Sequence, residues 1–176
     1  PEHNPPAGPP PPSTYAYSMI SLCFVCLGNI CRSPTAEGVM IHLIKERGLE
    51  DQIRVDSAGT ASYHIGEPAD SRSAAAAKRR GIHLPSRARQ FQAEDFEEFD
   101  YVLACDRSNY SNLKSLAGLH NEDKLHMFLD FDPSNPPGTS VPDPYYGGDQ
   151  GFETVLDMCE SACQQLLDHI VDEHNL

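Results

Sequence analysis

The stretch VCLGNICRSP occupies residues 25–34 and completes an apolar run, Met19–Val25, that predicts one buried strand. The next residues, Ser33-Pro34-Thr35-Ala36-Glu37, predict a helix start, because they offer a hydroxyl cap, a proline at the first helical position and an acid in the first turn. Residues 26–32 are therefore expected to form a strand-to-helix loop.

Strand and helix patterns alternate along the rest of the chain, which predicts an α/β protein with a parallel sheet. We expect a single-domain three-layer sandwich, with a four-stranded parallel sheet in flavodoxin-like strand order and helices on both faces. Ligands bind such sheets at the carboxyl ends of the strands, where the 26–32 loop begins. Strands are predicted at 19–25, 53–56, 101–105 and 124–129, and helices from 33 to 47, from a cap at Asp70 to 81, from 106 to about 117 and across 152–170.

Length and composition set the domain organisation. The chain has 176 residues, of which 39% are hydrophobic and 22% charged, and this fits one domain, expected over residues 19–176. Residues 1–18 are rich in proline and predict a disordered tail, a ligand for an aromatic-grooved adaptor domain, or an artefact of expression or of the start site. The chain lacks an apolar run of the roughly 20 residues that span a bilayer, and we expect no signal peptide, since the first residues include neither a basic region nor an apolar signal core. Its six cysteines fall mostly in apolar segments, so we expect reduced thiols and a cytoplasmic protein.

The charge balance limits the partners. Thirteen Lys and Arg against 26 Asp and Glu leave a net charge of −13, so the overall field repels polyanions. Nucleic acid and membranes are therefore not expected as partners. An anionic substrate would need a local positive site that overrides the global charge.

The 26–32 loop has the chemistry of such a site. A tight strand-to-helix turn directs backbone N–H groups inward, and the helix terminus adds partial positive charge. Gly28 and Asn29 tolerate the left-handed backbone that the turn needs, and Arg32 can hold two phosphate oxygens at once. The thiolate of Cys26 should be stabilised by the same amides, which makes it a candidate nucleophile.

Two other interpretations of the loop are weaker. It lacks the Lys-Ser/Thr ending of a nucleotide-binding loop, so no nucleotide cofactor is predicted. Cys26 and Cys31 alone provide too few ligands for zinc, and Cys159 and Cys163 coincide with an apolar helix stripe, which favours core packing. We therefore expect neither a metal nor a cofactor.

A second loop, VPDPYYGG at residues 141–148, supplies a candidate general acid. Departure of a phenol is easier when an acid protonates its oxygen, and a water must later be deprotonated to release phosphate. Asp143 could do both, while Tyr145 and Tyr146 would wall an aromatic substrate. From spacing alone, an Asp-Pro turn with surface tyrosines explains this loop better than a catalytic acid does.

The combined pattern resembles the low-molecular-weight protein tyrosine phosphatases. The resemblance runs from Met19 to the C-terminus and implies a metal-independent phosphatase that hydrolyses phosphotyrosine in protein substrates through a phosphocysteine intermediate. It implies that Cys26 attacks phosphorus, Arg32 binds phosphate and Asp143 protonates the leaving phenol, with inorganic phosphate as product and inhibitor. The motifs that carry it are VCLGNICRSP, VDSAGT at 55–60, GI-x-L and ARQF at 81–91, EEFDYVLACD at 97–106 and DPYYGG at 143–148.

The resemblance also assigns supporting roles within and around the phosphate-binding loop. Ser33 would bond the sulfur of the nucleophile, and Asn29 would hold the loop in its unusual conformation. Cys31 would form a disulfide with Cys26 on oxidation, since the loops of this family commonly do. The phosphate-binding loop would comprise Leu27, Gly28, Asn29, Ile30, Cys31, Arg32 and Ser33, with Ser57 in support and with Leu27, Ile30, Tyr63, Tyr145 and Tyr146 around the substrate ring.

One position departs from the family pattern and three alternatives stay open. Ser86 stands where animal members have a histidine bonded to the loop asparagine, so either Ser86 or a water replaces that bond, or the loop is less rigid. A related class of enzymes on this fold reduces arsenate with two extra cysteines about seven residues apart on a helix after the third strand, but here Cys105 has no partner cysteine at 111–113. Phosphoarginine phosphatases that resemble this chain carry threonine where Ile30 stands. A phosphate-binding module without turnover is the third alternative.

Overall fold

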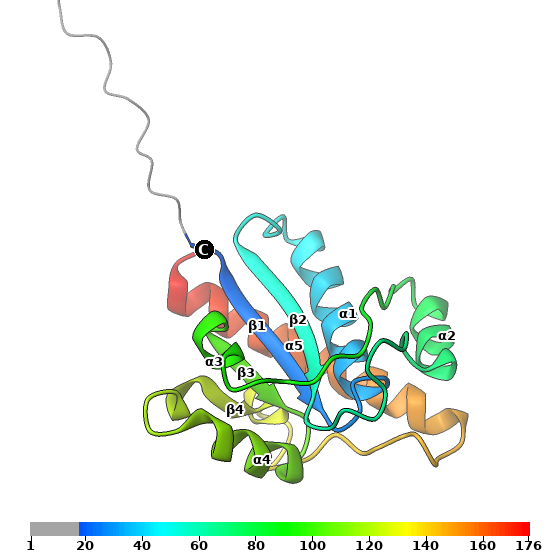
Figure 1. The fold of residues 1–176 in the computed structure, drawn as a ribbon. Coiled ribbons are helices and arrows are strands. Elements are labelled where there is room, and N and C mark those ends of the chain that lie inside the picture. The colour runs from blue at the N-terminus through cyan, green and yellow to red at the C-terminus, as the bar shows by residue number, and fades with distance from the viewer. Residues whose placement is uncertain (1–17) are drawn as a thin grey trace, which may run out of the picture.

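Four parallel strands form one sheet in the computed structural model, which describes residues 18–176 (Figure 1). The strand order is β2-β1-β3-β4, so the two central strands are β1 and β3. This is the predicted flavodoxin-like order, in which the direction of winding reverses between the first and third strands. The strands are β1 (Ile20–Cys26), β2 (Ile53–Gly59), β3 (Tyr101–Ala104) and β4 (Leu125–Met127).

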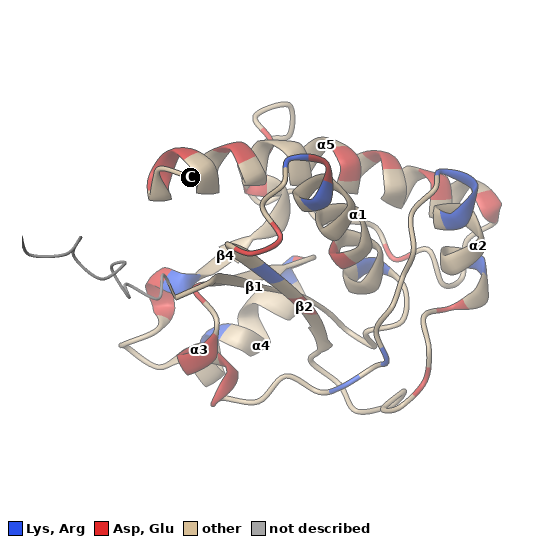
Figure 2. Ribbon diagram, turned by 90° about the horizontal axis from the view of Figure 1, so that it is seen from above, with Lys and Arg blue, Asp and Glu red and all other residues tan. Residues whose placement is uncertain are grey.

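Helices cover both faces of the sheet, which confirms the predicted three layers (Figure 2). The two long helices α1 and α5 pack together on one face, and α3 and α4 cover the other. Within residues 18–176 no helix is long and apolar enough to cross a membrane. The helices are α1 (Arg32–Glu46), α2 (Ser71–Arg79), α3 (Asp95–Glu98), α4 (Arg107–Ala117) and α5 (Asp149–His174), with 3₁₀ turns at Glu122–Lys124 and Phe128–Phe131.

The apolar run of β1 explains why this strand lies in the centre. Leu22 and Phe24 belong to the core beneath α1 and α5, whereas Cys23 and Val25 belong to the core beneath α3 and α4. Alternate side chains of a strand point to opposite faces, so a strand covered on both faces must be apolar throughout. Cys26 ends this strand, and its backbone lies at the carboxyl edge of the sheet where the loops gather.

The first helix begins differently from the sequence prediction. It starts at Arg32, its N-cap is Cys31 without a side-chain cap bond, and its first turn contains no acid. Ser33 is therefore inside the helix rather than at its cap, and Glu37 is buried against the sheet. The cap prediction was wrong because the Ser33 hydroxyl bonds the sulfur of Cys26 instead of a helix amide.

Other boundaries also shift. The second strand continues to Gly59, the fourth is only three residues long, and the four-residue helix α3 had no clear periodic signal. The Asp70 cap of α2 is confirmed, since its side chain accepts a hydrogen bond from the backbone N–H of Arg72. The predicted tail lies, except for residue 18, outside the described residues.

Candidate active site

The loop between β1 and α1 is shaped by one left-handed residue. Asn29 has φ of +58°, and its backbone N–H donates to Sγ of Cys26 at 3.3 Å. A left-handed asparagine is uncommon and is tolerated because its short polar side chain can hydrogen-bond locally. Gly28 was predicted to share this conformation and does not. A Cβ on Gly28 would lie 2.9 Å from Cδ2 of His64, so the glycine leaves room for that ring.

The sulfur of Cys26 is buried and lies among hydrogen-bonding groups. Ser33 Oγ lies 3.1 Å from the sulfur, and the Asn29 N–H approaches it from the loop. The 15-residue helix α1 starts at this point, so its N-terminal partial charge faces the same site. These groups surround the sulfur with hydrogen-bond partners and favour the binding of an anion next to it.

Arg32 is fixed by a carboxylate and a carbonyl. Its Nη1 lies 2.6 Å from Oδ2 of Asp106 and donates to the carbonyl of Val141 at 3.2 Å. Burial acts to lower the pKa of Arg32, but Cys105, Cys26 and Asp106 raise it above its ordinary value, so the guanidinium stays charged. Asp106 was not among the residues predicted to belong to the site. Its position directly after the third strand was the available signal, since carboxyl ends of parallel strands gather ligands.

Asp143 lies at the edge of the same site. Its Oδ1 accepts from the backbone N–H of Tyr145 at 3.0 Å, and its Oδ2 is 3.8 Å from Nη2 of Arg32. Two residues earlier, Val141 donates its N–H to the carbonyl of Cys105 at 2.8 Å, which ties this loop to the end of β3. The Asp-Pro turn and a role at the site are therefore compatible, because one carboxylate oxygen makes the turn and the other faces Arg32.

A cavity of about 340 Å³ opens above the sulfur. Its predicted wall residues are brought together, with Tyr145 and Tyr146 in an edge-to-face pair at 4.9 Å between ring centroids. His64 also lines the cavity and was not predicted, because a lone loop histidine carries no pattern. The residues around the cavity are Cys26, Leu27, Gly28, Ile30, Cys31, Arg32, Tyr63, His64, Asp143, Tyr145 and Tyr146.

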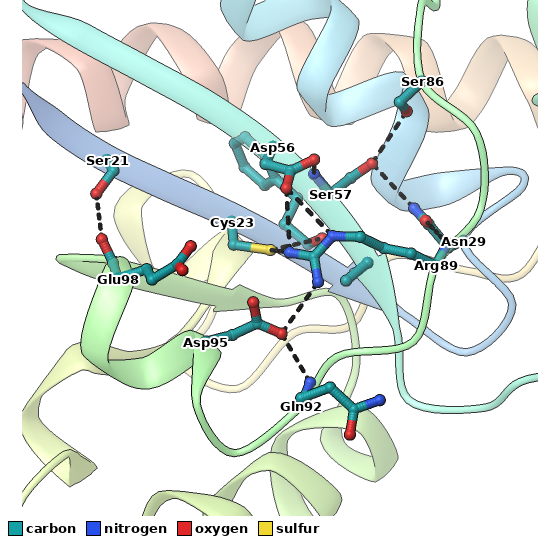
Figure 3. Close-up of polar contacts among 12 residues, drawn as sticks. Ser21, Cys23, Asn29, Asp56, Ser57, Ser86, Arg89, Gln92, Asp95 and Glu98 are labelled. Atoms are coloured by element: carbon teal, nitrogen blue, oxygen red, sulfur yellow. Dashed lines mark hydrogen bonds and ion pairs between the residues drawn. The ribbon is translucent and has the colours of Figure 1, made fainter. Parts of the chain in front are cut away.

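Ser86 does not replace the histidine bond directly. Its hydroxyl donates to Oε1 of Glu37 at 2.6 Å, and Ser57 donates to the same oxygen at 2.7 Å. Asn29 Nδ2 donates to Oγ of Ser57 at 2.9 Å, so Ser86 reaches the loop asparagine only through Ser57 (Figure 3). Burial raises the pKa of Glu37, and hydrogen bonds from Ser86 and Ser57 offset part of this rise. A serine is too short to reach Asn29 from this position.

Cys31 in the loop and Cys159 and Cys163 in α5 are free thiols. Cys31 is buried at the cavity wall, and burial raises its pKa to about 12. Cys159 and Cys163 lie in the core between α1 and α5, as predicted from their apolar stripe. Within residues 18–176, no group of three or more His, Cys, Asp or Glu side chains is arranged to hold a metal ion.

Comparison with known proteins identifies the family. The family model of the low molecular weight phosphotyrosine protein phosphatases matches residues 21–176. The chain is 42% identical over 159 residues to the low molecular weight protein-tyrosine-phosphatase YfkJ of Bacillus subtilis, covering 90% of this chain and all of the relative. The human low molecular weight phosphotyrosine protein phosphatase is 43% identical over 150 residues, which are 84% of this chain and 94% of that protein.

A solved structure agrees with this assignment. The protein tyrosine phosphatase from Entamoeba histolytica, crystallised with Hepes in its active site, superposes with a TM-score of 0.84 at 43% identity, over 89% of this chain and 99% of that one. Sequence and fold therefore agree over nearly the whole of the described part of the chain. The chain belongs to the low-molecular-weight phosphotyrosine protein phosphatase family.

Proposed function

We propose that this chain runs the phosphotyrosine phosphatase reaction with Cys26 as nucleophile, Arg32 as phosphate ligand and Asp143 as general acid. The proposal rests on one observation above all: these three side chains line a single cavity whose walls are aromatic and apolar. The family activity is cysteine-dependent and needs no metal. In this chain the charged Arg32 and the loop amides supply the positive charge that a phosphate requires.

In the first step, Sγ of Cys26 attacks phosphorus and the bond from phosphorus to the tyrosine oxygen breaks. Asp143 gives its proton to that oxygen, so the phenol leaves neutral. The phosphoryl group is then on Cys26, with its oxygens held by Arg32 and the loop N–H groups. The bond from Ser33 to the sulfur supports the thiolate before attack and after release.

In the second step, a water attacks the phosphocysteine. Asp143, now ionised, takes a proton from this water, the P–S bond breaks and the sulfur leaves as thiolate. Inorganic phosphate is the product, and it fits the same cradle as the substrate phosphoryl group. We therefore expect free phosphate to inhibit competitively.

The walls of the cavity favour an aromatic leaving group. Leu27 and Ile30 present apolar side chains beside the sulfur, and Tyr63, Tyr145 and Tyr146 stand at the mouth. A flat ring gains contact area from such walls. A phosphoarginine guanidinium would instead place polar N–H groups against the apolar side chain of Ile30, which costs free energy of desolvation.

The cellular setting follows from the thiols. Six free cysteines fit a reducing compartment, and we propose the cytoplasm. Cys31 remains our candidate for a disulfide partner of Cys26 under oxidation. Both residues line the cavity, so an oxidised Cys26 sulfur and the Cys31 thiol lie on the same loop.

Turnover assays separate these functions. We expect hydrolysis of p-nitrophenyl phosphate and of a phosphotyrosine peptide in buffer with excess EDTA, and much slower release of phosphate from a phosphoarginine peptide. Phosphate binding without turnover would establish a binding module, and preference for phosphoarginine would overturn the aromatic assignment. Thiol-dependent reduction of arsenate at a comparable rate would favour the reductase alternative.

A further inference from the structure

Four residues form a closed ring of hydrogen bonds beside the catalytic loop (Figure 3). The backbone N–H of Arg89 donates to Oδ1 of Asn29 at 3.0 Å, and Nδ2 of Asn29 donates to Oγ of Ser57 at 2.9 Å. The backbone N–H of Ser57 donates to Oδ1 of Asp56 at 2.8 Å. Oδ2 of Asp56 accepts from Nε and Nη2 of Arg89 at 3.2 and 3.0 Å, which closes the ring.

Arg89 is the member of this ring that reaches another layer of the fold. Its Nη1 lies 3.0 Å from Oδ2 of Asp95 in α3, while its other nitrogens bind Asp56 in β2. Its carbonyl accepts the N–H of Gly59 at 2.8 Å, which attaches this backbone to the end of β2. The two ion pairs of the guanidinium, to Asp56 and to Asp95, therefore fix the position of the Arg89 backbone. The backbone N–H of Arg89 in turn holds the side chain of Asn29.

The orientation of the Asn29 carboxamide matters because its other bond leads to the nucleophile. Nδ2 of Asn29 donates to Oγ of Ser33 at 2.8 Å, and Ser33 Oγ lies 3.1 Å from Sγ of Cys26. Asn29 is also the residue of the loop with a left-handed backbone. This conformation is strained for a residue other than glycine, and it is maintained only when several surrounding contacts hold it in place. If the carboxamide rotated, Asn29 would lose its hydrogen bond to Ser33, and the contacts that hold its left-handed backbone would be lost at the same time.

We propose that Arg89 is a positioning residue for the catalytic loop, which acts through Asn29 and the closed ring. The inference rests on the proposed function, since it concerns the geometry of the Cys26 nucleophile. Arg89 does not line the cavity, so it does not touch substrate. Its role is to hold the loop in the phosphate-binding shape before substrate arrives, which is the condition for electrostatic catalysis by preorganised donors.

Arg80 provides a matched control. It is also an arginine paired with two acidic side chains, here both from α5, with Nη2 2.6 Å from Glu153 and Nη1 2.9 Å from Asp157. It joins the end of α2 to α5 and has no hydrogen bond to the loop. At both positions, replacement by lysine keeps the positive charge. The ammonium group cannot bridge two carboxylates, however, because it lacks the planar fork of a guanidinium.

The test compares Arg89→Lys with Arg80→Lys on p-nitrophenyl phosphate, well below the melting temperature of either variant. We expect Arg89→Lys to lower kcat about tenfold, within the range that a misplaced catalytic group costs, and to weaken inhibition by inorganic phosphate in parallel. Arg80→Lys should leave both quantities within about twofold of the wild type. Equal kcat and phosphate inhibition in the two variants would overturn the inference.

A double-mutant cycle shows whether Arg89 acts through Asn29. In an Asn29→Ala background, Arg89→Lys should cause no further loss of kcat, because the carboxamide it positions is gone. If the two substitutions instead lower kcat by independent factors that multiply in the double variant, Arg89 does not act through Asn29 and the inference is contradicted. If Arg89→Lys does not fold, Asp95→Asn weakens the same clamp from α3 and takes its place in both comparisons. An inactive wild type would instead refute the proposed function, so the two failures are distinguishable.

Discussion

The Nη1 atom of Arg32 lies 2.6 Å from Oδ2 of Asp106, and both groups stand at the carboxyl edge of the sheet. The second oxygen of this carboxylate accepts the backbone N–H of Asn109 at 2.7 Å, which also makes Asp106 the cap of α4. One carboxylate thus joins the start of a helix to the arginine of the phosphate site. Among the described residues, Nε of Arg32 makes no hydrogen bond, which leaves that edge of the guanidinium for phosphate.

Replacing Asp106 by asparagine should separate these two roles. The amide oxygen can still cap α4, but it no longer pairs ionically with Arg32. We expect kcat to fall about tenfold and phosphate inhibition to weaken, with little change in melting temperature. Steady-state kinetics and a thermal melt on the same preparation provide the measurement. A large loss of stability with normal kcat would show that Asp106 is only a helix cap.

Asp143→Asn should slow substrates according to the basicity of their leaving oxygen. A basic phenolate needs the proton more than p-nitrophenolate does, so a phosphotyrosine peptide should lose about 10² or more in kcat while p-nitrophenyl phosphate loses much less. The ratio of the two losses is the measurement. Equal losses would mean that Asp143 positions Arg32 or the loop and does not act as the acid.

Glu37 makes stability depend on pH. Burial raises its pKa above the ordinary value of 4.5, so the folded state binds this proton more tightly than the unfolded chain does. The contribution of Glu37 to the free energy of unfolding is therefore fully present below pH 4.5, and it is lost as the pH rises through the folded-state pKa. We expect Glu37→Gln, which still accepts the hydroxyls of Ser57 and Ser86, to gain melting temperature relative to the wild type as the pH rises to neutrality. A constant difference across this range would contradict the buried-carboxyl account.

Oxidation tests the role of Cys31. Because burial raises the pKa of its thiol to about 12, Cys31 stays protonated at neutral pH and captures an oxidised Cys26 more quickly as the pH rises. After matched peroxide exposure, dithiothreitol should restore most activity to the wild type and much less to Cys31→Ser, and phosphate should protect both. Peptide mapping identifies the disulfide. Equal recovery, or the absence of a Cys26 to Cys31 link, would make Cys31 a packing residue.

Local patterns were enough to predict the sheet and the loop. The apolar run before Cys26 and the helix pattern after it are contiguous in sequence, and the parallel order follows from the alternation of elements. Cys26, Arg32 and Ser33 were identified by spacing and resemblance because one loop contains them all. The Asp143 loop was also recognisable as a unit, although spacing alone could not distinguish a turn from an acid.

Contacts that depend on chain folding could not be predicted in the same way. Asp106 and Arg32 are 74 residues apart, and the closed ring joins Arg89 to Asn29 across 60 residues. The start of α1 was misplaced for a related reason, since the Ser33 hydroxyl bonds a sulfur seven residues away rather than the nearest amides. Such choices depend on which partner the fold brings within hydrogen-bond distance.

The most direct test of the account is the covalent intermediate. A phosphotyrosine peptide is mixed with enzyme, the reaction is stopped by acid within the first turnover, and the protein is digested and mapped by mass spectrometry. The account predicts a phosphoryl group on Cys26, and a folded Cys26→Ser variant that binds phosphate but turns over no substrate. A phosphoryl group on another residue, or turnover by Cys26→Ser near the wild-type rate, would contradict it.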